Sequence, residues 1–214
     1  MITFKNAVIS VIVTVSLLGC AINVSPSAFF YQNTQQQPLD TTNLHAAIQK
    51  DKTSAGITRV EVKNDQGLTL RGVAVSYADP IVNIVFFADN RMALSENNSI
   101  IHRLGKLPAN ILWLDYQGVG ASDKAKNLSI NAIKQDALTQ FDYVENAFDA
   151  SLPTIVHGRG IGSYFASYVA ANRKIDALVL DGAFNDISDL IANMVPGFSN
   201  SFTNMKLHDE VHSM

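Results

Sequence analysis

Cysteine and basic residues are scarce in this 214-residue chain, and each scarcity narrows what the protein can be. The only cysteine is Cys20, which excludes an internal disulfide. Lysine and arginine total 16 against 19 aspartates and glutamates, a formal charge of −3, and no stretch clusters basic with aromatic residues. Nucleic acid is therefore not expected as a partner, because its binding relies on a concentrated positive footprint.

The first apolar run, Ala7 to Leu18, is too short to span a bilayer and has the form of the core of an export signal. The residues around its end, Leu17-Leu18-Gly19-Cys20, resemble the lipobox of bacterial lipoproteins, although Leu18 is bulkier than the usual Ala or Ser. The resemblance implies cleavage after residue 19 and lipidation of Cys20, and so a membrane as partner. A plain signal peptide and a buried apolar segment are the alternatives.

Ala21 follows the predicted anchor. By analogy with lipoproteins, the absence of Asp at this position implies the outer membrane of a Gram-negative cell, with the protein facing the periplasm. Residues 21–42 are polar and lack an apolar period, which is typical of a tether. We therefore predict a signal peptide over residues 1–19, a tether and lead-in over 20–56, and one domain over 57–214.

The remainder of the chain alternates between strand-like and helix-like patterns. Two alternating segments separated by a turn-rich break predict an antiparallel hairpin. Four short apolar runs predict buried strands, and the helix-spaced segments between them favour a mostly parallel sheet. The hairpin is expected over Ile57 to Val62 and Leu68 to Val75; the strands over Ile81 to Phe87, Ile111 to Leu114, Thr154 to Val156 and Ala177 to Leu180; and the helices over Ala93 to Leu104, Ser129 to Phe148 and Gly162 to Asn172.

A glycine-rich turn lies between the third apolar run and the last of these helices. Its sequence, His157-Gly158-Arg159-Gly160-Ile161-Gly162-Ser163, resembles the G-x-S-x-G nucleophile elbow of α/β-hydrolases, with Gly160 in place of the serine. Gly158 and Gly162 fit a turn so tight that side chains would collide there. Gly160 fits the strained apex but removes the hydroxyl that the chemistry needs.

Three further segments extend the resemblance over about Ile57 to Leu190. Asp115 to Ser122 is similar to the D-Y-R-G-x-G-x-S segment of family members with a small cap or none. Residues 84–90 resemble the strand and loop that supply an oxyanion-hole amide, but Ala88 and Asp89 replace His and Gly, and a carboxylate there would repel an oxyanion. Residues 178–190 resemble the sixth strand and the loop after it. The family implied is one of serine hydrolases of esterase, lipase or peptidase type.

The resemblance also implies that the catalytic acid and histidine follow the sixth strand, on two further strands. In this chain the candidates after that strand are His208, Asp209, Glu210 and His212, and no apolar strand precedes them. We therefore expect an α/β-hydrolase-like sheet that lacks its last two strands, with no working triad. The expected protein is a pseudoenzyme or a truncated hydrolase that needs no cofactor.

Other readings of single residues remain open. His157 is more typical of a strand-end packing histidine than of a catalytic one, and Ser163 more typical of a capping or packing hydroxyl than of a substitute nucleophile. His208 and His212 have the spacing of a helical metal pair, but a third ligand is not evident, so no metal is expected. An active ester or peptide hydrolase with another nucleophile is one alternative function. Binding of a nucleotide at the glycine-rich turn, with Asp181 on the ribose, is another.

The expected end of the sheet has a consequence for association. Ala177 to Leu180 would be an apolar edge strand, and such edges recruit other chains unless they are covered. Residues 185–214 offer helix-spaced apolar positions but no strand-like run. We expect self-association, an envelope partner, or marginal stability.

Overall fold

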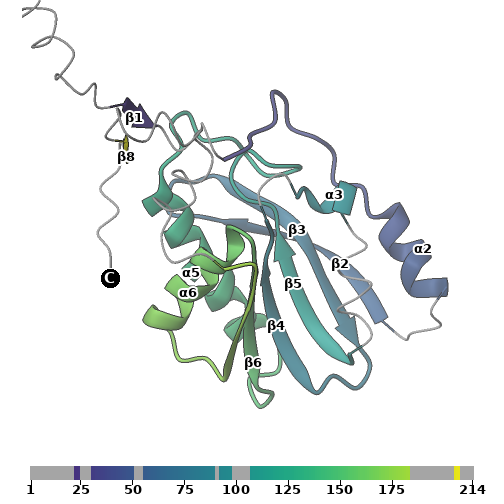
Figure 1. The fold of residues 1–214 in the computed structure, drawn as a ribbon. Coiled ribbons are helices and arrows are strands. Elements are labelled where there is room, and N and C mark those ends of the chain that lie inside the picture. Colours follow the sequence, from purple (N-terminus) through teal and green to yellow (C-terminus); the bar gives the residue numbers. More distant parts are fainter. Residues whose placement is uncertain are drawn as a thin grey trace, which may run out of the picture.

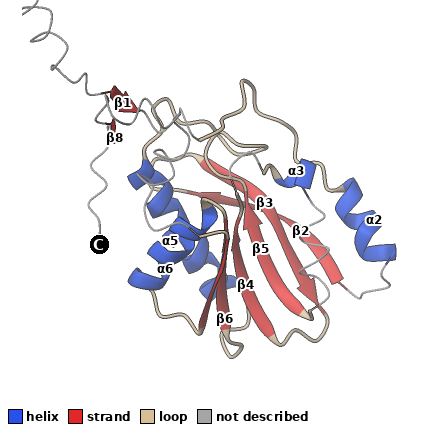
Figure 2. Cartoon of the chain, viewed as in Figure 1, coloured by secondary structure: helices blue, strands red, loops and turns tan. Residues whose placement is uncertain are grey.

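A mixed sheet of six strands forms the centre of the computed structural model, which describes residues 22–24, 30–50, 55–89, 92–97, 107–183 and 205–207 (Figures 1 and 2). In spatial order the strands are β2 (Ala55–Lys63), β3 (Thr69–Tyr77), β5 (Ala109–Leu114), β4 (Val82–Phe87), β6 (Thr154–Arg159) and β7 (Ala177–Asp181). The β2–β3 and β3–β5 pairs are antiparallel and the remaining pairs are parallel. The predicted α/β class, with an N-terminal antiparallel hairpin, is confirmed.

Two helices cover one face of this sheet, α5 (Ile130–Ala147) and α6 (Gly162–Asn172). Both match the predicted ranges. Ser129 caps α5 by accepting the Ala132 amide, which satisfies a donor left open at the helix start. The helix predicted over Ala93 to Leu104 is described only as α3 (Leu94–Asn97), and its remaining residues lie outside the described part of the chain.

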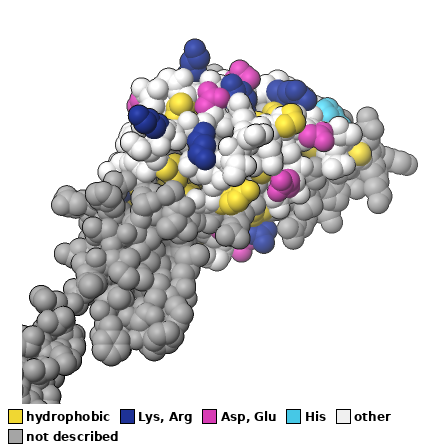
Figure 3. Space-filling model, turned by 90° about the horizontal axis from the view of Figure 1, so that it is seen from above, with side chains coloured by type: hydrophobic (Ala, Val, Ile, Leu, Met, Phe, Trp, Pro, Cys, Tyr) yellow, Lys and Arg dark blue, Asp and Glu magenta, His cyan; other side chains and the backbone are white. Residues whose placement is uncertain are grey.

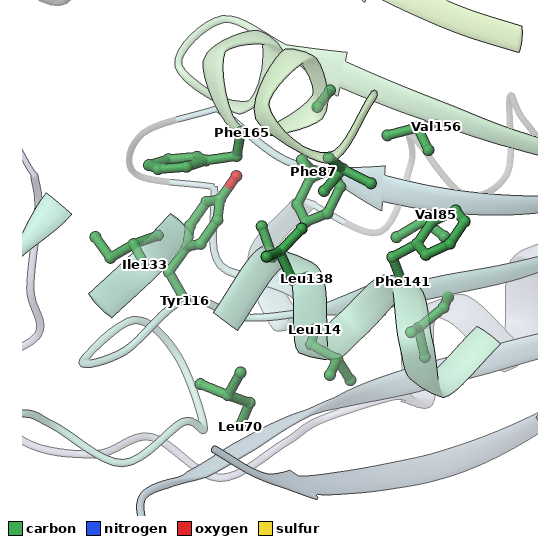
Figure 4. Packing of buried hydrophobic residues seen from close by; sticks show 14 of the residues in the cluster. Leu70, Val85, Phe87, Leu114, Tyr116, Ile133, Leu138, Phe141, Val156 and Phe165 are labelled. Carbon is green, nitrogen blue, oxygen red and sulfur yellow. The ribbon is translucent and has the colours of Figure 1, made fainter. Parts of the chain in front are cut away.

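The core has two halves, one on each face of the sheet, because successive side chains of the buried strands point in opposite directions. In β4, Val85 and Phe87 face α5 and α6, where Figure 4 shows Phe87 and Tyr116 in the same apolar cluster as Phe165. Ile84 and Phe86 face the other way. A strand that is buried on both faces has a continuous apolar sequence, which is the pattern that predicted β4.

The second face is covered by α2 (Thr42–Lys50), which the sequence analysis did not predict. Leu44 and Ile48, four residues apart, are buried against the sheet. Residues 30–40 lead to this helix across the carboxyl ends of the strands, with Phe30 buried near Tyr116 on the opposite face. The tether predicted over residues 21–42 is therefore wrong for residues 30–42, which pack on the domain; the domain boundaries themselves stay predictions.

Two three-residue strands, β1 (Ile22–Val24) and β8 (Met205–Leu207), form a separate parallel pair. The sequence predicted no strand after β7, and β8 corrects that expectation. It pairs with β1 and not with β7. The helix considered for the region after Asn185 lies outside the described residues. Of the helices that the structure describes, none has the length and apolarity needed to cross a membrane.

Among the strands that the structure describes, β7 lies at one end of the six-stranded sheet, the position expected for Ala177 to Leu180. Its five residues are all exposed, and Leu178, Val179 and Leu180 retain 38%, 43% and 41% of their accessible surface. An apolar strand with this exposure presents both side chains and backbone groups to other chains.

Candidate functional site

The glycine-rich turn forms a tight corner between β6 and α6. Gly160 lies at its apex with a φ of 54°, in the left-handed region where glycine is favoured. A Cβ at Gly158 would collide with the backbone of Gly162 and Ser163, and a Cβ at Gly162 with the carbonyl of Phe87. The corner therefore has the close backbone approach expected of a nucleophile elbow.

The space above the apex is filled by the side chain of Asp89, from the loop after β4. A Cβ built at Gly160 would overlap the carboxyl group of Asp89. One oxygen of this carboxylate, Oδ1, accepts the backbone N–H of Ile161 at 3.1 Å. In an α/β-hydrolase the amide after the nucleophile is an oxyanion-hole donor. Here that amide faces an anion supplied by the protein itself.

Three further amides around this corner donate hydrogen bonds within the chain. Gly160 N–H donates to the Asp181 carbonyl at 2.7 Å, Ser163 N–H to the Gly160 carbonyl at 3.0 Å, and Tyr164 N–H to the Ile161 carbonyl at 3.1 Å. A bound pyrophosphate needs such amides as donors. With Asp89 adding negative charge at the turn, this arrangement does not favour the nucleotide alternative.

His157 lies near the end of β6, three residues before the apex. Its ring packs edge-on against Phe86, with centroids 5.2 Å apart. Burial lowers the pKa of His157, and the carboxylate of Asp181 partly offsets this. Asp181 in turn lies 3.6 Å from Arg159. The imidazole is therefore mostly neutral at neutral pH.

Ser163 begins the first turn of α6 and is 2% exposed. Its hydroxyl donates to the Gly158 carbonyl at 3.0 Å, which ties the helix back to β6. A hydroxyl held in this way and screened from solvent is poorly placed to attack a substrate.

The segment from Asp115 to Ser122 stabilises the neighbouring loops through hydrogen bonds. The Asp115 carboxylate accepts the amides of Leu94 at 2.8 Å and Ala121 at 3.3 Å. The Ser122 hydroxyl donates to the Asp115 carbonyl at 2.7 Å and accepts the Arg71 amide at 2.8 Å. The Asp115 and Ser122 side chains of this motif therefore bind backbone groups of the loops around them.

Residues before the hairpin complete this region, and the sequence analysis missed them. Asn33 exchanges hydrogen bonds with the glycines of the segment: its N–H donates to the Gly118 carbonyl at 2.7 Å, and its Oδ1 accepts the Gly120 amide at 2.8 Å. The Gln37 amide donates to the Gly120 carbonyl at 2.8 Å. These pairings join positions more than 80 residues apart, and the polar composition of residues 32–37 gave no signal for them.

The structure brings Ala88, Asp89, His157, Gly158, Gly160, Gly162 and Ser163 together at the elbow. The other sequence candidates, Cys20, His208, Asp209, Glu210 and His212, lie outside the described residues. Within the described part of the chain, no group of three His, Cys, Asp or Glu side chains could hold a metal ion. On the face seen in Figure 3, acidic and basic side chains are interspersed.

No family model and no curated protein matches the sequence. Solved structures do match. An esterase of Pyrococcus furiosus aligns with a TM-score of 0.57 at 15% identity over 81% of this chain and 66% of that one. An alpha-beta hydrolase of Vibrio vulnificus aligns with a TM-score of 0.60 at 20% identity over 85% and 68%. The mouse alpha/beta hydrolase domain-containing protein 10 aligns at 0.50 and 15% identity over 67% and 57%.

This chain therefore spans about two thirds of the length of the two microbial structures. Identities of this size establish fold and leave activity open. The strand order, the antiparallel N-terminal pair and these superpositions together show that the chain has the α/β-hydrolase fold.

Proposed function

We propose that this chain is an envelope lipoprotein whose α/β-hydrolase-like domain does not perform serine-hydrolase catalysis. The observation that carries the second half of the proposal is the position of Asp89: its carboxylate fills the space above Gly160 and accepts the Ile161 amide. A serine hydrolase needs a hydroxyl at this apex and a free donor for the oxyanion. This elbow has no hydroxyl at its apex, and the amide that would bind the oxyanion already faces the Asp89 carboxylate.

A hydrolase that uses another nucleophile is also disfavoured at this elbow. Ser163 is buried and its hydroxyl donates to a main-chain carbonyl. A developing oxyanion at the Ile161 amide would also meet the Asp89 carboxylate. These reasons do not depend on any strand beyond β7.

The lipoprotein half of the proposal rests on Leu17 to Cys20 and on the export signal before it. Only residues 21–29 separate the proposed lipid from Phe30, which is buried in the domain. An extended chain spans at most about 3.6 Å per residue. The domain is accordingly proposed to lie close to the membrane surface, where it would bind or support envelope components.

A fluorophosphonate probe tests the catalytic part directly. The purified mature protein is incubated with the probe at neutral pH, beside an intact serine hydrolase as positive control. No covalent adduct is expected by mass spectrometry, and no turnover of short-chain p-nitrophenyl esters above buffer. An adduct that disappears in Ser163→Ala, or turnover lost in His157→Ala, would overturn the proposal. Gly160→Ser alone is expected to remain unlabelled, because the Asp89 carboxyl group occupies the space of the new side chain and already binds the Ile161 amide.

A further inference from the structure

A cavity of about 460 Å³ lies between the β2–β3 hairpin and the segment that leads to α2. Arg59 and Glu61 of β2 and Arg71 of β3 line it from the hairpin, and Gln36 and Gln37 line it from the segment. Sites for small molecules commonly have volumes of roughly 300–1,000 Å³. The cavity shares no lining residue with the elbow, so a role for it does not depend on whether the elbow is active.

Both sides of the cavity are held in place within the chain. The Gln37 amide donates to the Gly120 carbonyl at 2.8 Å, and Gln36 Nε2 donates to the Ala121 carbonyl at 2.6 Å. The hairpin side is a regular antiparallel ladder. Because these parts are already ordered, a ligand that enters the cavity does not have to order them, which favours binding.

Arg71 is fixed by the two carboxylates that it binds. Its Nε donates to Glu61 Oε1 at 3.0 Å, and its Nη1 donates to Asp123 Oδ1 at 2.6 Å. Asp123 also accepts the Thr69 amide at 2.9 Å. Nη2 of Arg71 donates to no acceptor among the described residues. Both carboxylates are therefore bound by donors of the chain, while this guanidinium keeps unused N–H groups.

Arg59 is an exposed cation whose guanidinium makes no hydrogen bond and no ion pair with the described residues. Asp40 is close enough for its charge to interact with that of Arg59, but the Asp40 carboxylate accepts the Thr42 amide at 2.9 Å, at the start of α2. The N–H groups of a guanidinium form a planar fork that matches the oxygens of a carboxylate. Arg59 therefore offers this fork to a molecule in the cavity.

We propose that the cavity binds a small organic molecule that carries one carboxylate, and that this carboxylate pairs with Arg59. Of the described charged residues that line the cavity, Arg59 and Arg71 are basic and Glu61 is acidic, which leaves one excess positive charge. A single carboxylate balances this charge. A phosphate dianion or a polyanion would exceed it and would be repelled by Glu61 and by the neighbouring Asp123 and Asp40.

The rest of the ligand is expected to be polar. The side chain of Gln37 makes no hydrogen bond to the described residues and carries both a donor and an acceptor. Nη2 of Arg71 supplies further donors. These groups suit amides or hydroxyls, so a short peptide with a free carboxyl end is the simplest ligand of this class.

NMR titrations of the isotope-labelled mature protein with N-acetyl-trialanine, and with the same peptide carrying a C-terminal amide, test the need for a carboxylate. The free acid should give saturable shifts of the backbone amides of Gln37, Arg59 and Arg71. The amidated peptide should bind at least about tenfold more weakly, because it lacks the charge-assisted hydrogen bonds. Inorganic phosphate should also bind more weakly than the free acid. Equal affinity for the two peptides, tighter binding of phosphate, or no saturable shift would overturn the proposal.

Variants of β2 test the role of Arg59. Arg59→Gln should weaken the binding of the free acid at least about tenfold and leave that of the amidated peptide unchanged. Lys63→Gln is the matched control, because it removes one positive charge from the same strand without lining the cavity, and it should keep the wild-type affinity. Wild-type affinity in Arg59→Gln, or equal losses in both variants, would overturn the proposal.

Glu61→Gln tests the charge balance in the opposite direction. It removes the acidic group from the lining, while Asp123 still binds Arg71. The affinity for the free acid should therefore rise severalfold, with little change for the amidated peptide. An unchanged or lower affinity for the free acid would contradict pairing of the carboxylate with the excess positive charge.

Discussion

The carboxylate of Asp89 and the amide of Ile161 lie 3.1 Å apart, and this contact joins the end of β4 to the corner between β6 and α6. It places a negative charge of the chain where an α/β-hydrolase would stabilise the charge of its reaction intermediate. The contact also makes residues 89 and 160 interdependent, because the same carboxyl group fills the space of a side chain at the apex.

That interdependence predicts the outcome of a double-mutant cycle. Gly160→Ala should destabilise the protein by the left-handed strain of about 1–2 kcal/mol and by a further collision with Asp89. Asp89→Ala removes the colliding group, so the double variant should be more stable than the sum of the single effects by about 1 kcal/mol or more. Urea unfolding of the four proteins measures the coupling.

Gly67→Ala is the matched control for this cycle. Gly67 has a φ of 76° and its Cβ would meet no atom within 4 Å, so it carries the same strain without a collision. Gly67→Ala should therefore cost less than Gly160→Ala. Equal costs, or strict additivity of Gly160→Ala with Asp89→Ala, would mean that Asp89 does not occupy the apex in solution.

A second buried carboxylate predicts a dependence of stability on pH. Asp136 on α5 accepts Asn64 Nδ2 at 2.8 Å and Gln117 Nε2 at 2.6 Å, and burial raises its pKa to about 6. Because the folded state then binds the proton more tightly than the unfolded state, its contribution to the free energy of unfolding falls as the pH rises from about 4 to 6.

Asp136→Asn should remove this part of the pH dependence. The buried Oε1 of Gln117 has no hydrogen-bond partner among the described residues, so a flipped Gln117 amide could accept from the new side chain. The stability difference between wild type and variant should change between pH 4 and 6 and stay constant above that range. A constant difference over the whole range would contradict the assignment.

The exposed edge of the sheet predicts a difference in local stability. Ala177 to Leu180 in β7 should exchange amide protons faster than Thr154 to Val156 in β6, since only one neighbour of β7 is found among the described strands. If the edge recruits a second copy, sedimentation should show a species larger than the monomer, and Val179→Lys should reduce it.

Leu107→Lys is the control for the edge, because Leu107 is also apolar and 53% exposed but lies outside the sheet. It should leave association unchanged. A monodisperse monomer in which β7 is protected as strongly as β6 would show that the edge is covered by another part of the chain.

The proposed anchor predicts a chemical label. Palmitate supplied to growing cells should be incorporated into the protein, because lipidation of Cys20 attaches acyl chains to this thiol and to the amine exposed by cleavage. Cys20→Ser should abolish incorporation while leaving the protein exported or uncleaved. Incorporation that persists in Cys20→Ser would refute lipidation at this residue.

Sequence alone determined most of the sheet and the two long helices. The continuous apolar runs of β4 and β5 indicate strands that are buried on both faces. The alternating pattern of β2 and β3 indicates a hairpin. Both patterns are local to each strand. The start of α5 follows from Ser129, whose capping hydroxyl acts within one turn. Glycines 158, 160 and 162 marked the elbow because backbone geometry restricts residue type at a tight corner.

The contacts of residues 30–50 and of Asp89 are decided by the tertiary structure alone. Leu44 and Ile48 offered a weak helical signal, but Asn33 and Gln37 bind partners more than 80 residues away, and such pairings leave no local pattern. The sequence showed a carboxylate at position 89 and a glycine at position 160 without showing that one fills the space above the other. That relation arises because β4 and β6 are paired side by side, which brings residues separated by about 70 positions into contact.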